Sequence, residues 1–271
     1  MRISFLFWNI NGRDLGRRVA RIAAAHSVDI LALAECSMSP DTLVGQLNDQ
    51  SHGGYCLPKS EGRRIRIVTR QSLSALSDDF NDPIGGLTIR KMRVRGMPDL
   101  LLAATHFPSR LHWDGNDQTL EATELAHDIV RAEERNGHQR TILIGDLNMN
   151  PFDPGVVGAQ ALNAVMTKEL ARRESRVVRG RPFPFFYNPM WGFFGDRTDG
   201  PSGSYYFAGA KPTNQYWHIF DQLLIRPGLI NHLEEVRILD HDGEKGLLSA
   251  SGLPDTNDAS DHLPILFGLR F

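Results

Sequence analysis

The sequence predicts an α/β fold in which short buried strands alternate with amphipathic helices. The first observation is the opening of the chain, where two apolar runs, Arg2–Trp8 and Val28–Ala34, flank a segment with helical spacing, Arg13–His26. Strand–helix–strand order is typical of an α/β sheet. The second is Thr141–Ile144, an uninterrupted run of β-branched residues and leucine, which indicates a strand buried on both faces. Because the 271 residues contain no internal repeat and no clear linker, we expect a single domain over residues 1–271.

The remaining elements follow from the same two patterns. Short runs of apolar residues predict strands, and apolar residues that recur about every 3.6 positions predict helices. The predicted strands are Arg64–Thr69, Leu87–Val94, Leu100–Thr105, Ile219–Ile225, Val236–Leu239 and Pro264–Phe271, and the predicted helices are Asp41–Gln50, Glu121–Arg135 and Pro154–Leu170.

The segment Arg172–Pro212 has no clear period. Proline, glycine and aromatic residues crowd it, and we therefore expect a long irregular loop. A loop of this length inside a domain is usually functional or faces a partner. It begins within a basic stretch, Lys168–Arg181, which holds six basic residues against two acidic ones. We expect this loop to meet either an anionic substrate, a regulatory protein or a second copy of the chain.

The composition excludes several classes of protein. A net charge of −2 indicates no global positive field of the kind that attracts nucleic acid. Two cysteines, Cys36 and Cys56, are too few for a disulfide framework or a structural zinc site. The apolar start of the chain is too short for a signal peptide, and no run of about 18 apolar residues predicts a membrane span. We therefore expect a cytoplasmic protein that is not integral to a membrane.

Polar residues stand at one end of six predicted strands. Each one taken singly is explained by a turn or a helix cap. Several carboxylates beside buried strands nevertheless need a shared polar site, because an unpaired carboxylate in a core costs roughly several kcal/mol. Clustered carboxylates repel one another unless a cation lies among them, and hard oxygen ligands suit Mg²⁺ or Mn²⁺. The residues are Asn9 and Asn11, Glu35, His106, Asp146 and Asn148, Asp221, and Asp261 with His262.

The motifs that hold these residues resemble the endonuclease/exonuclease/phosphatase superfamily, the deoxyribonuclease-I-like group. One such motif alone is weak, but six occur in the family's order and span nearly the whole chain. The resemblance implies a four-layer α/β sandwich: two mixed β-sheets packed face to face, with helices on the outside. It also implies a metal-dependent phosphoesterase. The motifs are WNING at Trp8–Gly12, the glutamate of LALAEC, THFPSR at Thr105–Arg110, IGDLNMNP, FDQLL around Asp221 and SDHLPI at Ser260–Ile265.

The resemblance also assigns the metal ligands. Glu35 is then the main ligand of Mg²⁺ or Mn²⁺, with Asn9 or Asn11 beside it, and Asn9 is a further candidate for binding substrate. Many nucleases of the group have aspartate at the position of Asn11, so a weaker metal site is expected here. Asp261 completes the metal shell or belongs to a second cation site.

The same resemblance assigns the catalytic groups. His262 is the general base or a group that polarises the phosphate, and Asp221 orients it. Asp146 orients or activates the attacking water, and Asn148 donates to a phosphate oxygen. His106 stabilises the pentavalent phosphorus or protonates the leaving alkoxide, and it favours the sphingomyelinase-like and deoxyribonuclease-I-like members over the abasic-site endonucleases.

The expected substrate is nucleic acid, DNA or RNA, cleaved by in-line attack of water. Arg110 is a candidate phosphate contact. In the loop, Arg173, Arg176 and Arg179 are expected to meet phosphates while aromatic side chains stack on bases. Alternatively, the loop folds onto the sheets or onto a partner subunit. Two further functions stay open: a phosphodiesterase or phosphatase for phospholipids or small molecules, and a non-catalytic binding domain.

Overall fold

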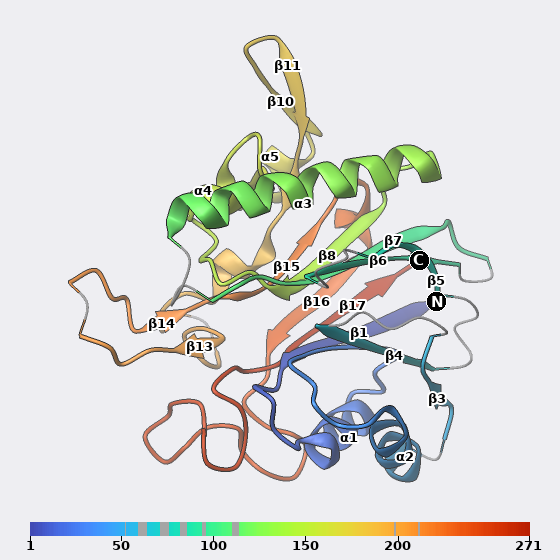
Figure 1. Ribbon diagram of the computed structural model, residues 1–271, viewed down its shortest axis with the longest axis vertical. Coiled ribbons are helices and arrows are strands. Elements are labelled where there is room, and N and C mark those ends of the chain that lie inside the picture. Colours follow the sequence, from blue (N-terminus) through green and yellow to red (C-terminus); the bar gives the residue numbers. More distant parts are fainter. Residues whose placement is uncertain are drawn as a thin grey trace.

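Two β-sheets pack face to face between outer helices, and they form four layers in the computed structural model (Figure 1). The structure describes residues 1–51, 53–58, 64–70, 76–81, 86–93, 96–109, 114–197, 199–210 and 212–271. Helices α1 (Gly16–Ala25) and α2 (Pro40–Ser51) lie on one side, and α3 (Gly115–Asn136) covers the other. Both sheets are mixed, which confirms the four-layer sandwich predicted from the sequence.

The first sheet is centred on β1, which pairs in parallel with β2 and antiparallel with β17. Every residue of β2 is buried, which explains why its sequence is an unbroken apolar run. The strand order is β16 (Leu233–Ile238), β17 (Ile265–Arg270), β1 (Arg2–Asn9), β2 (Ile30–Ala34), β4 (Ile65–Arg70) and β3 (Tyr55–Cys56).

The second sheet is centred on β8, which pairs in parallel with β7 and antiparallel with β15. Alternate residues of β8 serve two cores: Ile142 and Ile144 face the first sheet, and Leu143 packs with α3. The strand order is β5 (Leu76–Asn81), β6 (Leu87–Met92), β7 (Leu100–His106), β8 (Thr141–Asp146), β15 (Asp221–Ile225), β12 (Phe186–Tyr187) and β9 (Ala164–Val165).

The pairing brings the polar strand ends to one edge of the sandwich. Because β7 and β8 are parallel and in register, His106 lies opposite Asp146. Because β15 is antiparallel to β8, its first residue, Asp221, also pairs with Asp146. In the other sheet, Asn9 ends β1 beside the end of β2, directly before Glu35. Topology thus collects side chains that are far apart in the sequence.

Two predictions of secondary structure were wrong. The predicted helix over 154–170 is broken: Gly158 ends α4 and Asn163 adopts a φ of 51°, so a short strand follows instead. The predicted irregular loop over 172–212 contains a β-hairpin, whose turn at Arg179 and Gly180 has positive φ at both positions. The strands predicted at 64–69 and 87–94 are confirmed as β4 and β6, and they lie in different sheets. The additional elements are α4 (Pro154–Val157), α5 (Lys168–Ala171), β10 (Ser175–Val178), β11 (Arg181–Pro184), η1 (Pro189–Phe193), β13 (Tyr205–Tyr206), β14 (Trp217–His218) and η2 (Pro227–His232).

Helix α3 begins earlier than the apolar stripe predicts. Asp114 accepts hydrogen bonds from the backbone of Asn116 and Asp117, and Asp117 in turn accepts from the backbone of Asp114. This capping box starts the helix about two turns before Ala122, its first buried apolar residue. Neither α3 nor any other helix among the described residues combines the length and apolar character needed to cross a bilayer.

Candidate active site

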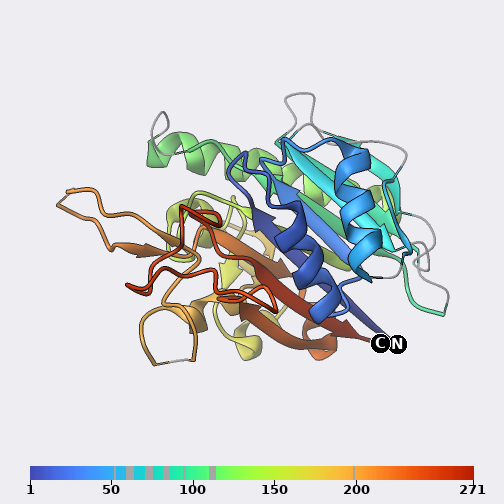
Figure 2. The ribbon, with the colours of Figure 1, turned by 90° about the horizontal axis from the view of Figure 1, so that it is seen from below.

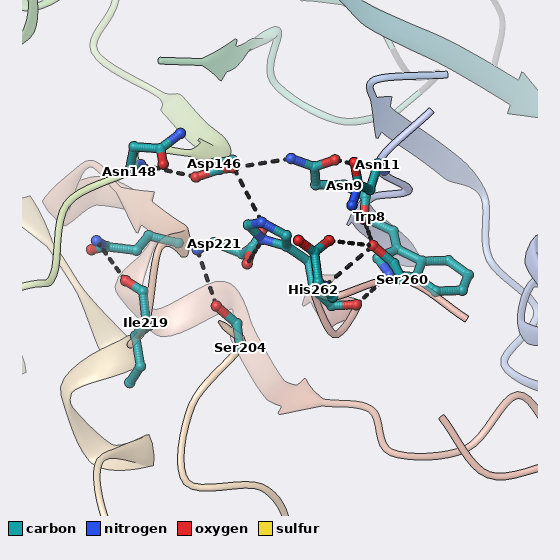
Figure 3. Close-up of polar contacts among 12 residues, drawn as sticks. Trp8, Asn9, Asn11, Asp146, Asn148, Ser204, Ile219, Asp221, Ser260 and His262 are labelled. Carbon is teal, nitrogen blue, oxygen red and sulfur yellow. Dashed lines mark hydrogen bonds and ion pairs between the residues drawn. The ribbon is translucent and has the colours of Figure 1, made fainter. Parts of the chain in front are cut away.

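A buried histidine–aspartate pair forms the centre of the polar edge. Nδ1 of His262 lies 2.8 Å from Oδ2 of Asp221, and both side chains are buried (Figure 3). The other ring nitrogen, Nε2, lies 3.8 Å from Oδ2 of Asp146. Burial disfavours the charged imidazolium, but the carboxylates of Asp221 and Asp146 outweigh it and raise the pKa of His262 to about 10. The pair therefore holds one imidazole in a defined orientation beside a second carboxylate.

Asn9 links Asp146, at the end of β8 in the second sheet, to Glu35, which follows β2 in the first sheet. Its Nδ2 donates to Oδ2 of Asp146 at 3.0 Å and to Oε1 of Glu35 at 3.1 Å. Its Oδ1 accepts the backbone N–H of Asn11 at 2.9 Å. Asn9 thus uses both ends of its amide to position two carboxylates and the turn that follows β1.

His106 lies against the same two carboxylates. Its Nε2 is 3.4 Å from Oε1 of Glu35 and 3.8 Å from Oδ2 of Asp146. The Asn148 backbone donates to Oδ1 of Asp146 at 2.9 Å, and the Asn148 side chain donates to the carbonyl of Phe107 at 2.9 Å. Asn148 is therefore fixed beside Asp146 by two independent hydrogen bonds.

Three residues of the site have unusual backbones. Asn11, Glu35 and Asn148 have φ values of 49°, 51° and 49°. Asparagine tolerates this left-handed region, but glutamate rarely adopts it. The strain at Glu35 is compatible with a side chain that is held for function rather than for stability.

The segment that carries Asp261 and His262 is anchored to β1. The Ser260 hydroxyl donates to the carbonyl of Asn9 at 2.7 Å, and Nε1 of Trp8 donates to the carbonyl of His262 at 2.8 Å. Asp261 is half-buried and accepts from the Ser260 hydroxyl at 3.2 Å. These ties keep Asp261 and His262 at the edge where the other strands end.

The sequence did not reveal how His262 is packed. The ring of Tyr205 lies 4.6 Å from the His262 ring, and the two residues form an isolated antiparallel bridge. Ser204 accepts the backbone N–H of Asp221 at 3.1 Å. Ser204 and Tyr205 lie outside every motif in the sequence and reach the site only through tertiary contacts. Ser260, by contrast, belongs to the SDHLPI motif and could have been identified from the sequence.

The carboxylates fit a divalent cation. Among the described residues, Glu35, Asp146 and Asp221 form ion pairs only with His106 and His262, and none with lysine or arginine. The ligand atoms of Asp146, Asp221 and His262 all lie within 4.8 Å of one another, and Asn9 donates to both Asp146 and Glu35, so negative charge is concentrated at this edge. Oxygen-rich donor sets with excess negative charge suit Mg²⁺ or Mn²⁺ better than zinc.

Arg176, in the 172–212 segment, makes its hydrogen bonds away from this edge. Arg176 donates to the Val157 carbonyl at 2.6 Å and to Oδ1 of Asn163. The hairpin β10–β11 leads into β12, where Tyr187 pairs with Ile225, the residue of β15 farthest from Asp221. At about 3.3 Å per residue, the distance along β15 from Asp221 to Ile225 is roughly 13 Å. The hairpin precedes Tyr187 in an antiparallel neighbour of β15, so it lies still farther from Asp221. Figure 1 shows the hairpin projecting beyond α3, away from β14.

Arg176 and Arg173, which is exposed at the base of the same hairpin, lie away from the reacting groups, and their contact with substrate phosphates stays a prediction. Arg110 lies outside the described residues, and its role stays a prediction. A protein partner for the 172–212 segment also stays a prediction.

Comparisons with known proteins agree with this geometry. A sequence model of the endonuclease/exonuclease/phosphatase family matches residues 6–262. A comparison with curated proteins finds no match. Truncated TDP2 from Caenorhabditis elegans is similar in structure, with a TM-score of 0.59 and 20% identity, over 100% of this chain and 98% of that one.

Two further solved structures have the same fold. TDP2 from D. rerio, in complex with a single-strand DNA product, has a TM-score of 0.58 and 15% identity over 100% of this chain and 99% of that one. The catalytic domain of human nocturnin, with a bound sulfate anion, has a TM-score of 0.60 and 13% identity over 100% and 94%. At these identities the likeness shows the fold, and the chemistry is argued from the residues.

Proposed function

Because this chain belongs to the endonuclease/exonuclease/phosphatase family, we propose that it is a phosphodiester hydrolase that depends on Mg²⁺ or Mn²⁺ and cleaves nucleic acid. The observation that carries the proposal is the His262–Asp221 pair beside Asp146, since a base oriented by a buried carboxylate suits water activation. The D. rerio TDP2 complex and the sulfate-bound nocturnin domain support it, because the same fold holds a DNA product and a tetrahedral oxyanion in those proteins.

In this proposal the metal is held at Glu35 and Asp261, with Asn11 beside them. Asn9 would position Glu35 rather than bind the ion, because its Nδ2 donates to that carboxylate. When bound, the divalent ion would neutralise charge on the phosphate oxygens and lower the pKa of His262 towards the range in which imidazole accepts a proton.

The remaining groups act on water and phosphate. Asp146 orients the attacking water, and Nε2 of His262 accepts its proton. Asp221 keeps the proton of the imidazole on Nδ1 and stabilises the imidazolium that forms. Asn148 donates to a phosphate oxygen, and His106 stabilises the charge that develops on the phosphorane or on the leaving oxygen.

The first experiment measures hydrolysis of a bis-aryl phosphodiester during titration with Mg²⁺ and Mn²⁺ after chelation. His262→Ala and Asp146→Ala are each expected to lower kcat by about 10²-fold or more, because each removes an acid–base or electrostatic group. Glu35→Gln is expected to raise the metal concentration needed for half-maximal rate. Asp128→Asn, on the outer surface of α3, is the matched control.

The second experiment compares plasmid DNA, single-stranded DNA, RNA and phospholipid vesicles as substrates. Turnover of the nucleic acids supports a nuclease, and turnover of phospholipid alone replaces it with a phospholipid or small-molecule phosphodiesterase. No turnover of any substrate with either ion would point to a non-catalytic binding domain. The cytoplasmic location expected from the sequence stays a prediction.

A further inference from the structure

A two-stranded arm projects from the body of the protein beside the site. We define this aromatic arm as residues 203–210 and 212–218, which include β13 and β14. Figures 1 and 2 both show the arm extending outward from the sandwich. Its base is fixed, because Ser204 donates to the His218 carbonyl at 2.9 Å and accepts the N–H of Leu263 at 2.7 Å. The arm is therefore attached directly to the segment that carries His262.

The arm has one face on the site and one face away from it. Tyr205 pairs with His218, and Tyr206 pairs with Trp217. Directly opposed side chains share a face, and successive ones alternate. Tyr205 packs on His262, so Tyr206 and Trp217 lie on the second face, one residue from the catalytic pair.

The second face is a cluster of aromatic rings. The Tyr206 ring lies 5.4 Å from Trp217 in an edge arrangement and 6.3 Å from Tyr216 in a stacked one. Tyr206 and Trp217 are half-buried, but Tyr216 is 53% exposed. A large aromatic side chain with this exposure does not serve the core.

Tyr216 is also held in a strained backbone. Its φ is 65°, a region that bulky residues rarely adopt. Asn214 accepts the Tyr216 N–H at 2.9 Å and donates to the carbonyls of Phe207 and Gly209, both at 2.8 Å. Asparagine or glycine would occupy position 216 with less strain. An exposed ring kept there at this cost points to a role for the ring itself.

The chemistry of the arm favours a nucleobase as its ligand. The sequence from 203 to 218 has no Asp, Glu or Arg and a single lysine, Lys211, so the arm does not repel a polyanion. The same segment has no leucine, isoleucine or valine, so it offers flat aromatic faces rather than aliphatic side chains to a ligand. Bases within a duplex are already stacked on their neighbours, whereas those of a single strand offer a free π-face.

We propose that Tyr206 and Tyr216 stack on a nucleobase of single-stranded nucleic acid, next to the phosphate that the site attacks. The proposal rests on the proposed nuclease function and names its substrate class. It explains how a chain with a net charge of −2 holds nucleic acid: contacts to bases add to contacts with the backbone.

The test measures binding without turnover, by fluorescence anisotropy of a labelled oligonucleotide in the presence of a chelator. Tyr216→Asn removes the ring and tolerates positive φ, and Tyr206→Leu keeps bulk beside Trp217 without a π-face. Each is expected to weaken binding of single-stranded DNA by about fivefold to 100-fold, the equivalent of one stacked base. Tyr216→Phe should retain wild-type affinity. Val177→Asn, at a valine 69% exposed on the β10–β11 hairpin, is the matched control.

Two comparisons make the test specific for bases. An abasic oligonucleotide of the same length should bind the wild-type protein more weakly than the intact strand, and the two tyrosine variants should lose this difference. Equal affinity for intact and abasic strands would overturn the proposal, as would unchanged binding by Tyr216→Asn and Tyr206→Leu. If Tyr216→Asn and Tyr206→Leu bind the oligonucleotide as the wild-type protein does but lose binding to phosphatidylcholine vesicles, the ligand of the arm is lipid and the proposal is wrong.

The proposed function is tested separately. Failure of the wild-type protein to hydrolyse the bis-aryl phosphodiester with either metal would remove the nuclease activity, whatever the binding data show. Thermal unfolding of each variant, followed by circular dichroism, excludes loss of folded protein as the cause of weaker binding.

Discussion

Replacing Asp221 by asparagine tests the central feature of the site with almost no change in shape. Asp221 is fully buried at the first position of β15, and its Oδ2 lies 2.8 Å from Nδ1 of His262. In the native pair the carboxylate only accepts, so Nδ1 carries a proton, and once His262 is neutral in the metal-bound protein its Nε2, beside Asp146, is the nitrogen that accepts the proton of water. An asparagine amide can instead donate to Nδ1, which moves the imidazole proton to Nε2.

This change of tautomer determines the expected loss. An imidazole that carries its proton on Nε2 cannot accept the proton of water there. The variant also lacks the charge that stabilises the imidazolium. The equivalent substitution in a serine-protease triad lowers kcat by about 10⁴-fold, and we expect a loss of about 10³- to 10⁴-fold here.

The assay is a double-mutant cycle with a bis-aryl phosphodiester at saturating Mg²⁺. Groups that act as one unit are not additive, so Asp221→Asn combined with His262→Ala should be no slower than His262→Ala alone. Thermal unfolding of every variant reports whether the fold is intact. Multiplied losses in the double variant, or a loss below about tenfold for Asp221→Asn, would refute the assignment of the pair as a catalytic unit.

Two further predictions concern the scaffold. A Cβ at Gly145 would lie 2.1 Å from the carbonyl oxygen of Thr105 on the neighbouring strand. Gly145→Ala should therefore lower the free energy of unfolding by about 3 kcal/mol in urea titrations. Wild-type stability of this variant would contradict the prediction, because it would mean that β7 and β8 can move apart at no cost in free energy. Burial opposes ionisation of Asp242, but Arg21 and backbone N–H groups lower its pKa to about 2 from 3.8. The ionised carboxylate therefore stabilises the folded protein by about 2 kcal/mol above pH 4. This contribution is lost as the pH falls from about 4 to 2. Asp242→Asn should abolish that part of the pH dependence, and an unchanged acid-unfolding curve would contradict it.

The site and the arm together describe how one edge of a sandwich is used. The His262–Asp221 pair is fixed by buried hydrogen bonds, and Tyr205 packs on its ring. The aromatic arm continues from Tyr205 into solvent, so the proposed chemistry and the proposed contact to a base share one attachment point. A displacement of the arm would therefore move Tyr205 and with it the ring of His262, so that a contact between substrate and arm would change the position of the proposed base.

The sequence by itself determined the long buried strands and the polar residues at their ends. A strand such as β8 is apolar on both faces, and this local property is visible without any knowledge of its neighbours. The order of the motifs from Asn9 to His262 then indicated the family and the sandwich, and the structure confirms the fold.

The tertiary structure alone decided which polar groups meet and how. The register of β15 against β8 places Asp221 opposite Asp146, and no local pattern encodes a pairing across 75 residues of chain. Strands of two residues, such as Phe186–Tyr187, have no period to detect and exist only because Ile225 and Ala164 lie beside them. For the same reason the sequence did not show that Arg176 lies on a β-hairpin and donates to the Val157 carbonyl. Local hydrophobic pattern specifies strands, and contacts between distant segments specify the site.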